Sequence, residues 1–180
     1  MDIFDIKKCL DSIEVLIDSR EQPNKRAEKR YKSFDCPYRR QKLEYGDYTY
    51  NCILPDGKPL YGEEDKVNPD VFIERKMNLE ELSQCFCQSR DRFEREMERA
   101  TDHGAKIYLL VENATYENLL NGKYKTKFHP EAFTASLFAW VARYNIVPVF
   151  CKSEMSGKVI KKILFRELKE RLTRGDYDAR

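Results

Sequence analysis

The sequence predicts an α/β fold in which a mixed sheet is covered by helices on both faces. Short apolar runs that are typical of buried strands (VLI, VFI, IYLLV and IVPVF) alternate with longer segments whose apolar residues recur at helical spacing. Strands that alternate with helices in this way usually lie in a sheet between two helical layers. With 180 residues and 41% hydrophobic residues, the chain suits a single domain over residues 1–180.

In the first half of the chain we expect a strand over residues 14–18, because the VLI run precedes the polar segment DSREQP. A helix fits residues 24–34, since Ala27, Tyr31 and Phe34 fall on one face. A second strand should follow over residues 41–54 and turn at the PDG segment, 55–57. The polar residues 60–69 are expected to form a mobile loop.

In the second half, a strand over 71–76 leads into one long helix over 79–100. Its core stripe is Leu79, Leu82, Phe86, Phe93 and Met97. The pattern then predicts a strand at 106–112, a short helix at 116–120, a helix at 130–144, a strand at 146–150 and a final helix at 156–172. Residues 174–180, which repeat Gly-Asp-Tyr without a following Glu-x-Lys, are expected to form a flexible tail.

Several classes of protein are disfavoured by composition. No stretch approaches the roughly 18 apolar residues of a membrane span, and the acidic, interrupted start does not fit a signal peptide. We therefore expect no membrane association. The location should be the cytoplasm (the nucleoid, or a host cell) for a prokaryotic or viral protein, or the nucleus for a eukaryotic one.

Six scattered cysteines without a CxxC pair, far from His103 and His129, indicate reduced thiols rather than a zinc site.

Positive charge is concentrated in one segment although the whole chain carries only +2. Residues 23–42 contain eight basic and two acidic residues, which suggests a polyanionic partner. Tyr31, Phe34 and Tyr38 interleave these charges, as in a nucleic-acid groove, although a solvated helix with an apolar underside would contain them too.

Charged residues directly follow the buried strand VFI. In a strand, Glu74 and Lys76 project to one face and Arg75 to the other. A carboxylate beside an ammonium can hold a divalent metal if a second acid is near, and Asp47 in EYGDYTY is the obvious supplier. Taken alone, an Asp followed by Glu-x-Lys occurs by chance in many charged sequences, where it forms no more than a surface ion pair.

Three motifs in order make the pattern more specific. VLIDSREQ (15–22), GDY (46–48) and FIERK (72–76) together resemble the ERCC4-type nuclease domain of the XPF family of structure-specific endonucleases, whose signature is GDx(n)ERKx(3)D. The chain matches this signature at Gly46, Asp47 and the ERK triplet, with Glu80 in the position of the last Asp. The order of the later helices and strands also fits, so the resemblance spans nearly the whole chain.

This resemblance implies a restriction-endonuclease-like (PD-(D/E)xK) fold with Mg²⁺ or Mn²⁺ as cofactor. Asp47 and Glu74 would be the metal carboxylates, the backbone carbonyl of Arg75 would complete the protein ligands, and Lys76 would position the attacking water. Asp18 would be an accessory metal ligand and Glu21 an orienting group at the edge of the site, with Arg20 near the phosphate. A polar turn after the first strand is the alternative for these three residues.

The expected activity is cleavage of branched or structured DNA (a flap, fork or junction) in repair, recombination or replication. A catalytically silent DNA- or partner-binding module and a sequence-specific restriction-type enzyme are the alternatives. Family members usually carry a further DNA-binding or helicase module, so we expect specificity to come from this domain, from a homodimer or heterodimer, or from an accessory protein. The residues expected to contact DNA are Arg20, Lys25, Arg26, Lys29, Arg30, Arg39, Arg40, Arg90, Lys123 and Lys125.

Overall fold

A computed structural model describes residues 1–63 and 66–178. Its helices are α1 (Ile3–Asp11), α2 (Lys25–Lys32), α3 (Leu79–Phe86), α4 (Arg90–Asp102), α5 (Tyr116–Leu120), α6 (Pro130–Tyr144) and α7 (Ser156–Arg174). Its strands are β1 (Glu14–Asp18), β2 (Tyr38–Gln41), β3 (Tyr48–Asn51), β4 (Val71–Lys76), β5 (Lys106–Glu112) and β6 (Ile146–Cys151). None of the described helices is both long and apolar enough to cross a membrane.

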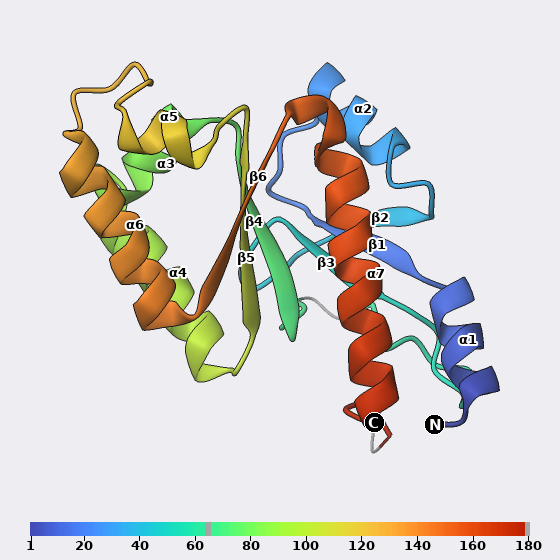
Figure 1. The fold of residues 1–180 in the computed structure, drawn as a ribbon. Helices are drawn as coiled ribbons and strands as arrows, with labels where there is room; N and C mark the ends of the chain where they lie inside the picture. Colours follow the sequence, from blue (N-terminus) through green and yellow to red (C-terminus); the bar gives the residue numbers. More distant parts are fainter. Residues whose placement is uncertain (64–65, 179–180) are drawn as a thin grey trace.

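Within the described residues, the strands form one six-stranded sheet in the order β2-β1-β3-β4-β5-β6. β1 pairs with β2 and β5 with both β4 and β6 in parallel, whereas β3 is antiparallel to β1 and β4. As Figure 1 shows, α1, α2 and α7 lie on one side of this sheet and α3, α4, α5 and α6 on the other. The mixed sheet between helical layers confirms the predicted fold class.

Two hydrophobic clusters fill the spaces between the sheet and its helical layers. One contains Val71 and Ile73 of β4 together with Ile160 and Leu164 of α7. The other contains Phe72 of β4 together with buried residues of α3, α4 and α6. β4 is therefore covered on both faces, which explains why its apolar residues form a continuous run.

Two predicted elements are wrong, because each is divided into two elements at a point where the sequence pattern runs on without a break. The strand expected over 41–54 is divided between β2 and β3, since residues 42–47 leave the sheet and Gly46 turns with a φ of +76°. The long helix expected over 79–100 is divided into α3 and α4 at Cys87, where φ is −116° and ψ is −91°. Phe86 and Phe93, on either side of this break, both pack on Trp140, at ring-centroid distances of 5.0 and 4.9 Å.

The two ends of the described chain lie close together (Figure 1), and the C-terminal one differs from expectation. The start is helical, with Asp2 capping α1 by accepting a 2.8 Å hydrogen bond from the amide of Asp5. The region expected to be a flexible tail is packed through Asp178: Tyr177 is buried, and its hydroxyl lies 2.6 Å from that of Tyr50. Residues 179–180 of that tail, and residues 64–65 of the expected loop over 60–69, lie outside the described residues.

Candidate active site

β4 presents Glu74 and Lys76 on one face, as strand geometry predicts. Since Phe72 packs toward α3 and α4, residues 74 and 76 face the same layer. The Lys76 ammonium donates a 2.5 Å hydrogen bond to the Glu74 carboxylate. The guanidinium of Arg75 projects the other way and donates to Glu112 at 3.2 Å. The strand therefore carries a carboxylate–ammonium pair toward the α3–α4 side of the sheet.

Asp47 is fixed beside this pair by main-chain contacts. Gly46, which precedes it, must lack a side chain because a Cβ would collide with the ring of Phe72. The amide of Arg75 donates to the Asp47 carboxylate at 2.7 Å, and the amide of Asp18 donates to the Asp47 carbonyl at 2.8 Å. Strands β1 and β4 thus hold the Asp47 carboxylate next to the backbone of the Glu-Arg-Lys segment.

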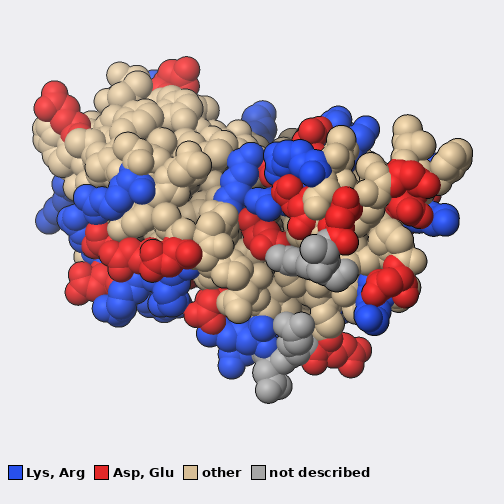
Figure 2. Space-filling model, turned by 90° about the horizontal axis from the view of Figure 1, so that it is seen from below, with Lys and Arg blue, Asp and Glu red and all other residues tan. Residues whose placement is uncertain are grey.

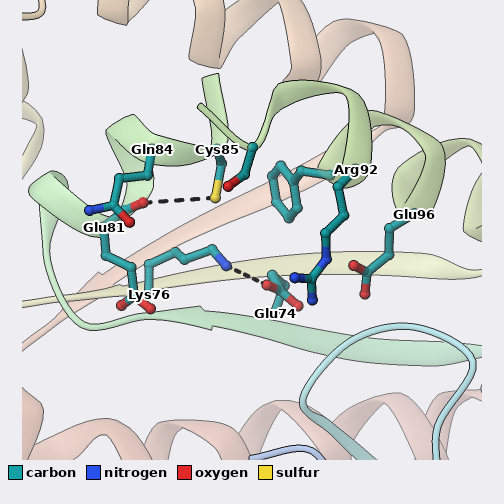
Figure 3. Close-up of a pocket in the computed structure, with 9 residues that line it drawn as sticks. Glu74, Lys76, Glu81, Gln84, Cys85, Arg92 and Glu96 are labelled. Carbon is teal, nitrogen blue, oxygen red and sulfur yellow. Dashed lines mark hydrogen bonds and ion pairs between the residues drawn. The ribbon is translucent and has the colours of Figure 1, made fainter. Parts of the chain in front are cut away.

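These side chains border a polar cavity of about 270 Å³ at the end of β4. It adjoins a smaller pocket, shown in Figure 3, in which residues of α3 and α4 stand over Glu74 and Lys76. The larger cavity is lined by Asp18, Arg20, Glu21, Gly46, Asp47, Glu74, Arg75, Lys76, Glu81, Arg92 and Glu96.

The acids in the cavity destabilise one another's charged forms. Burial and then the charge of Glu74 raise the pKa of Asp47 well above its usual range, and the same two causes raise the pKa of Glu96. Burial by itself lowers the pKa of Lys76, but the neighbouring Glu74 charge holds that pKa above its ordinary value, so Lys76 stays protonated. The cavity therefore combines a protonated lysine beside Glu74 with carboxylates that a bound metal cation would stabilise.

The donor set fits a hard divalent cation. Among the residues that the structure describes, no group of three His, Cys, Asp or Glu side chains is placed to coordinate a metal ion by itself. Mg²⁺ is usually held by only one or two carboxylates, with waters and substrate phosphates completing its shell. Asp47, Glu74 and the carbonyl of Arg75 offer this kind of incomplete oxygen set, whereas zinc would favour the sulfur and imidazole ligands that the cavity lacks in its described lining.

Asp18, Arg20 and Glu21 of the DSRE segment also lie at the cavity. The two oxygens of the buried Asp18 carboxylate accept hydrogen bonds from Arg20, at 2.5 Å, and from the amide of Leu43. Its predicted role as a metal ligand stays a prediction; in this structure it holds Arg20, whose side chain is half exposed, at the cavity edge.

Glu21 belongs to a buried network behind β4. Its carboxylate accepts hydrogen bonds from Arg30 at 2.8 Å, from Tyr48 at 2.6 Å and from Tyr31 at 2.7 Å. Arg30 also contacts Glu112 at 3.3 Å, and Arg75 contacts the same carboxylate. The network fixes the side of β4 opposite to Glu74 and Lys76.

Two of the residues expected to contact DNA are engaged inside the protein. Arg30 is only 7% exposed because it pairs with Glu21 and Glu112. Arg39 pairs with Glu14 at 2.9 Å on strand β2, at the far edge of the sheet from β4. The burial of Arg30 leaves no surface for direct phosphate contact, so that prediction is wrong, whereas the Arg39 side chain is 31% exposed and its DNA contact stays a prediction. The expectation for Arg30 failed because sequence shows charge but not which face of an element is buried.

The other predicted contacts are exposed. Lys25, Arg26 and Lys29 lie on α2, and Arg26 lies 3.4 Å from the sulfur of Met77, the residue after Lys76. Arg40 donates to the carbonyls of Ser19 and Glu21, which fastens the DSRE turn. Arg90, Lys123 and Lys125 are also exposed.

Other site features were not foreseen from the sequence. Glu96 of α4 accepts a 2.9 Å hydrogen bond from the amide of Gly46, while Glu81 and Arg92 also line the cavity. Glu80, at the last signature position, instead accepts from the amide of Lys125 at 2.8 Å and is not among the cavity-lining residues. The i, i+4 spacing of Arg92 and Glu96 was a usable signal, because it places both side chains on one face of a helix.

Known proteins share this arrangement of elements. A family model described as ERCC4 domain matches residues 17–163. Among solved structures, the chain is similar to XPF from Aeropyrum pernix, with a TM-score of 0.58 and 17% identity over 86% of this chain and 61% of that chain. A structure of XPF from Aeropyrum pernix in complex with DNA gives a TM-score of 0.55 and 17% identity over 89% and 65% of the respective chains.

The chain thus spans less than two thirds of each of these solved chains. A search of curated proteins found no match. The structural likeness, together with the mixed sheet between helical layers, shows a restriction-endonuclease-like fold.

Proposed function

The chain belongs to the ERCC4-domain family, and from this premise we propose that it is a metal-dependent endonuclease that hydrolyses phosphodiester bonds in branched DNA. The observation that carries the proposal is the meeting of Asp47, Glu74 and Lys76 at one polar cavity. The Asp47 carboxylate accepts a hydrogen bond from the amide of Arg75, and Lys76 donates one to Glu74. These groups therefore form one cluster rather than scattered surface charges.

In the proposed reaction, Asp47, Glu74 and the carbonyl of Arg75 would hold Mg²⁺ or Mn²⁺. The bound cation would lower the pKa of a water and offset the charge that develops on the phosphate. Lys76, which stays protonated, can donate to a phosphate oxygen or orient the attacking water. Because Glu74 and Lys76 are fixed on a buried central strand, their geometry needs little reorganisation during reaction.

The exposed cations near the site are the proposed DNA contacts. Arg20 lies at the cavity, and Arg26 and Lys29 line a second cavity of about 400 Å³ that also includes Met77 at the end of β4. On the face seen in Figure 2, which looks from below Figure 1, Lys and Arg side chains are interspersed with Asp and Glu. We propose that the cations beside the cavity bind DNA by contacting individual phosphates and thereby position its backbone.

We also propose pairing with a second copy of the chain through strand β6. This strand ends the described sheet, and its residues after Ile146 are half-buried. Tyr116 and Phe138 beside it are 39% and 45% exposed and stack on each other at 6.1 Å. Light scattering coupled to size exclusion should show a dimer for the wild type and a monomer for Phe138→Glu; a wild-type monomer would contradict this proposal.

The experiment for the activity uses labelled flap, fork, four-way junction and linear duplex DNA with Mg²⁺ or Mn²⁺. The wild type should cut the branched substrates, whereas Asp47→Asn and Lys76→Gln should retain binding and lose at least about 100-fold in cleavage rate. Binding without wild-type cleavage would favour a catalytically silent module. Equal cleavage of linear duplex at one defined sequence would favour a restriction-type enzyme.

A further inference from the structure

A groove leads away from the candidate active site between α3 and the segment that joins α5 to α6. It has a volume of about 590 Å³. Gln84, which is labelled in Figure 3 among the residues of the pocket over Glu74 and Lys76, also lines this groove, so the two hollows are neighbours. We call it the α3 groove. Its lining consists of Glu80, Ser83, Gln84, Cys87, Gln88, Lys125, Thr126, Lys127 and Phe128.

The wall opposite α3 is held in place by its own side chains. The Tyr124 hydroxyl donates a 2.8 Å hydrogen bond to the carbonyl of Phe128, and both rings pack against Phe133, at 5.3 and 5.0 Å. The amide of Lys125 donates to Glu80, which ties this wall to the first turn of α3. The groove is therefore a built feature of the fold rather than a gap beside an unattached loop.

The same anchoring turns the lysines outward. Lys123, Lys125 and Lys127 are exposed, while Tyr124, Thr126 and Phe128 between them are half-buried. Lys125 and Lys127 both line the groove, and among the described residues neither ammonium forms a salt bridge, since Glu80 accepts from the amide of Lys125. Two exposed ammonium groups beside an aromatic ring and amide side chains suit a ligand with phosphates and exposed bases.

We propose that the α3 groove binds a single-stranded segment of the DNA substrate as it leaves the active site. This inference rests on the proposed nuclease function. Lys125 and Lys127 would contact successive phosphates, and Phe128 with Gln84 and Gln88 would contact the bases. A duplex keeps its base faces stacked inside, so only an unpaired strand can contact both the lysines and the aromatic and amide side chains of the groove. Gln84 lines both the groove and the pocket that contains Lys76, so the groove lies next to the candidate active site.

Cys87 gives a direct test because it is exposed and lines the groove. The buried Cys85 is a poor competitor, since burial raises the pKa of its thiol to about 11. A flap substrate whose single-stranded arm carries, at successive positions, a nucleotide tethered to a mixed disulfide should exchange with Cys87 at a few positions near the branch. The S–S bond between Cys87 and the tether forms as the S–S bond of the mixed disulfide breaks, and the small thiol leaves. Cys87→Ser should abolish this product, and a duplex carrying the same tether should not form it.

A binding measurement tests the lysines. Fluorescence anisotropy without divalent metal should show that Lys125→Ala/Lys127→Ala binds flap DNA about tenfold more weakly, with the salt slope reduced by about 1.4, as expected for two single-strand phosphate contacts. Binding of linear duplex should change little. The double variant Lys158→Ala/Lys162→Ala, which removes the same charge from exposed positions on α7, should retain flap binding.

The results of the cross-linking and binding experiments either support or overturn the proposal for the α3 groove. Equal loss of flap and duplex binding, or the absence of a Cys87 cross-link at every arm position, would overturn it. Cleavage of flap DNA by the wild type in the same preparation separates the two claims: if the enzyme cuts but no cross-link forms, the groove proposal fails and the nuclease proposal stands. An acidic peptide that binds the groove while single-stranded DNA does not would also overturn the proposal.

Discussion

The amide of Arg75 donates a 2.7 Å hydrogen bond to the carboxylate of Asp47, two residues that are 28 positions apart in the sequence. This bond joins the turn that contains Gly46 to the end of the central strand β4. It brings together two motifs that are separated by a strand and a long connection. The Asp47 side chain is therefore joined directly to the main chain of the Glu-Arg-Lys segment.

The pair of Glu74 and Lys76 makes a prediction about stability. Their side chains are 9% and 12% exposed, so Lys76→Met should leave a buried carboxylate without its partner and lower the free energy of unfolding by about 3–5 kcal/mol. The double variant Glu74→Gln/Lys76→Met should recover most of this loss but not cleavage. Urea unfolding in the absence of divalent metal measures both effects. The single variant Glu74→Gln completes the comparison. If the double variant lost as much stability as the two single variants together, the two side chains would not be coupled.

Glu96 is expected to act as a positioning residue for the aspartate turn. Glu96→Ala removes the acceptor for the buried amide of Gly46, which should cost about 1–3 kcal/mol and reduce cleavage. Glu96→Gln keeps an acceptor oxygen, so it should keep stability while requiring more Mg²⁺ for half-maximal cleavage. Thermal unfolding and a Mg²⁺ titration of the cleavage rate separate the two effects. If Glu96→Ala matched the wild type in thermal stability and in the Mg²⁺ dependence of cleavage, Glu96 would not be a positioning residue for the aspartate turn.

Arg30 and Lys29 are adjacent on α2, but replacing each of them with alanine should have a different effect. Arg30→Ala breaks a buried ion-pair network with Glu21 and Glu112 and should destabilise the protein by about 3–5 kcal/mol. Lys29→Ala should leave stability unchanged and reduce the salt slope of duplex DNA binding by about 0.9 if it contacts one phosphate. Chemical unfolding and binding at several salt concentrations test the pair. A stable Arg30→Ala protein that only loses DNA binding would contradict this assignment.

Cysteine reactivity should depend on pH in a residue-specific way. Burial raises the pKa of the Cys151 thiol to about 11, so its reactive thiolate is scarce at pH 7.5 and increases as the pH rises toward 11. The exposed Cys87 should be alkylated first at pH 7.5. Iodoacetamide labelling followed by peptide mass spectrometry gives the order. Faster labelling of Cys151 than of Cys87 at pH 7.5 would contradict the burial pattern.

Much of the sheet could be predicted because its central strands are buried on both faces. The central strands β4 and β5 lie where their apolar runs indicate, and β1 ends at Asp18 as expected. The one-face placement of Glu74 and Lys76 follows from strand geometry alone. These features depend on local pattern, which a sequence displays directly.

The remaining differences come from packing that a local pattern does not encode. Phe86 and Phe93 are seven residues apart, which equals about two helical turns, so their spacing fits one helix although the chain breaks between them. The break lets both rings pack on Trp140 and lets α4 bring Glu96 to Gly46. Arg30 was misplaced for a related reason, because its buried partners Glu21 and Glu112 come from distant segments.

The central claim is that Asp47 and Glu74 share one divalent cation beside Lys76. The most direct measurement is the anomalous diffraction of crystals of the protein soaked in Mn²⁺. We predict one strong anomalous peak in contact with both carboxylates and with the carbonyl of Arg75, and its loss in Asp47→Asn crystals soaked identically. A peak elsewhere, or none at the end of β4 while the crystals hold Mn²⁺ at other acids, would contradict the account.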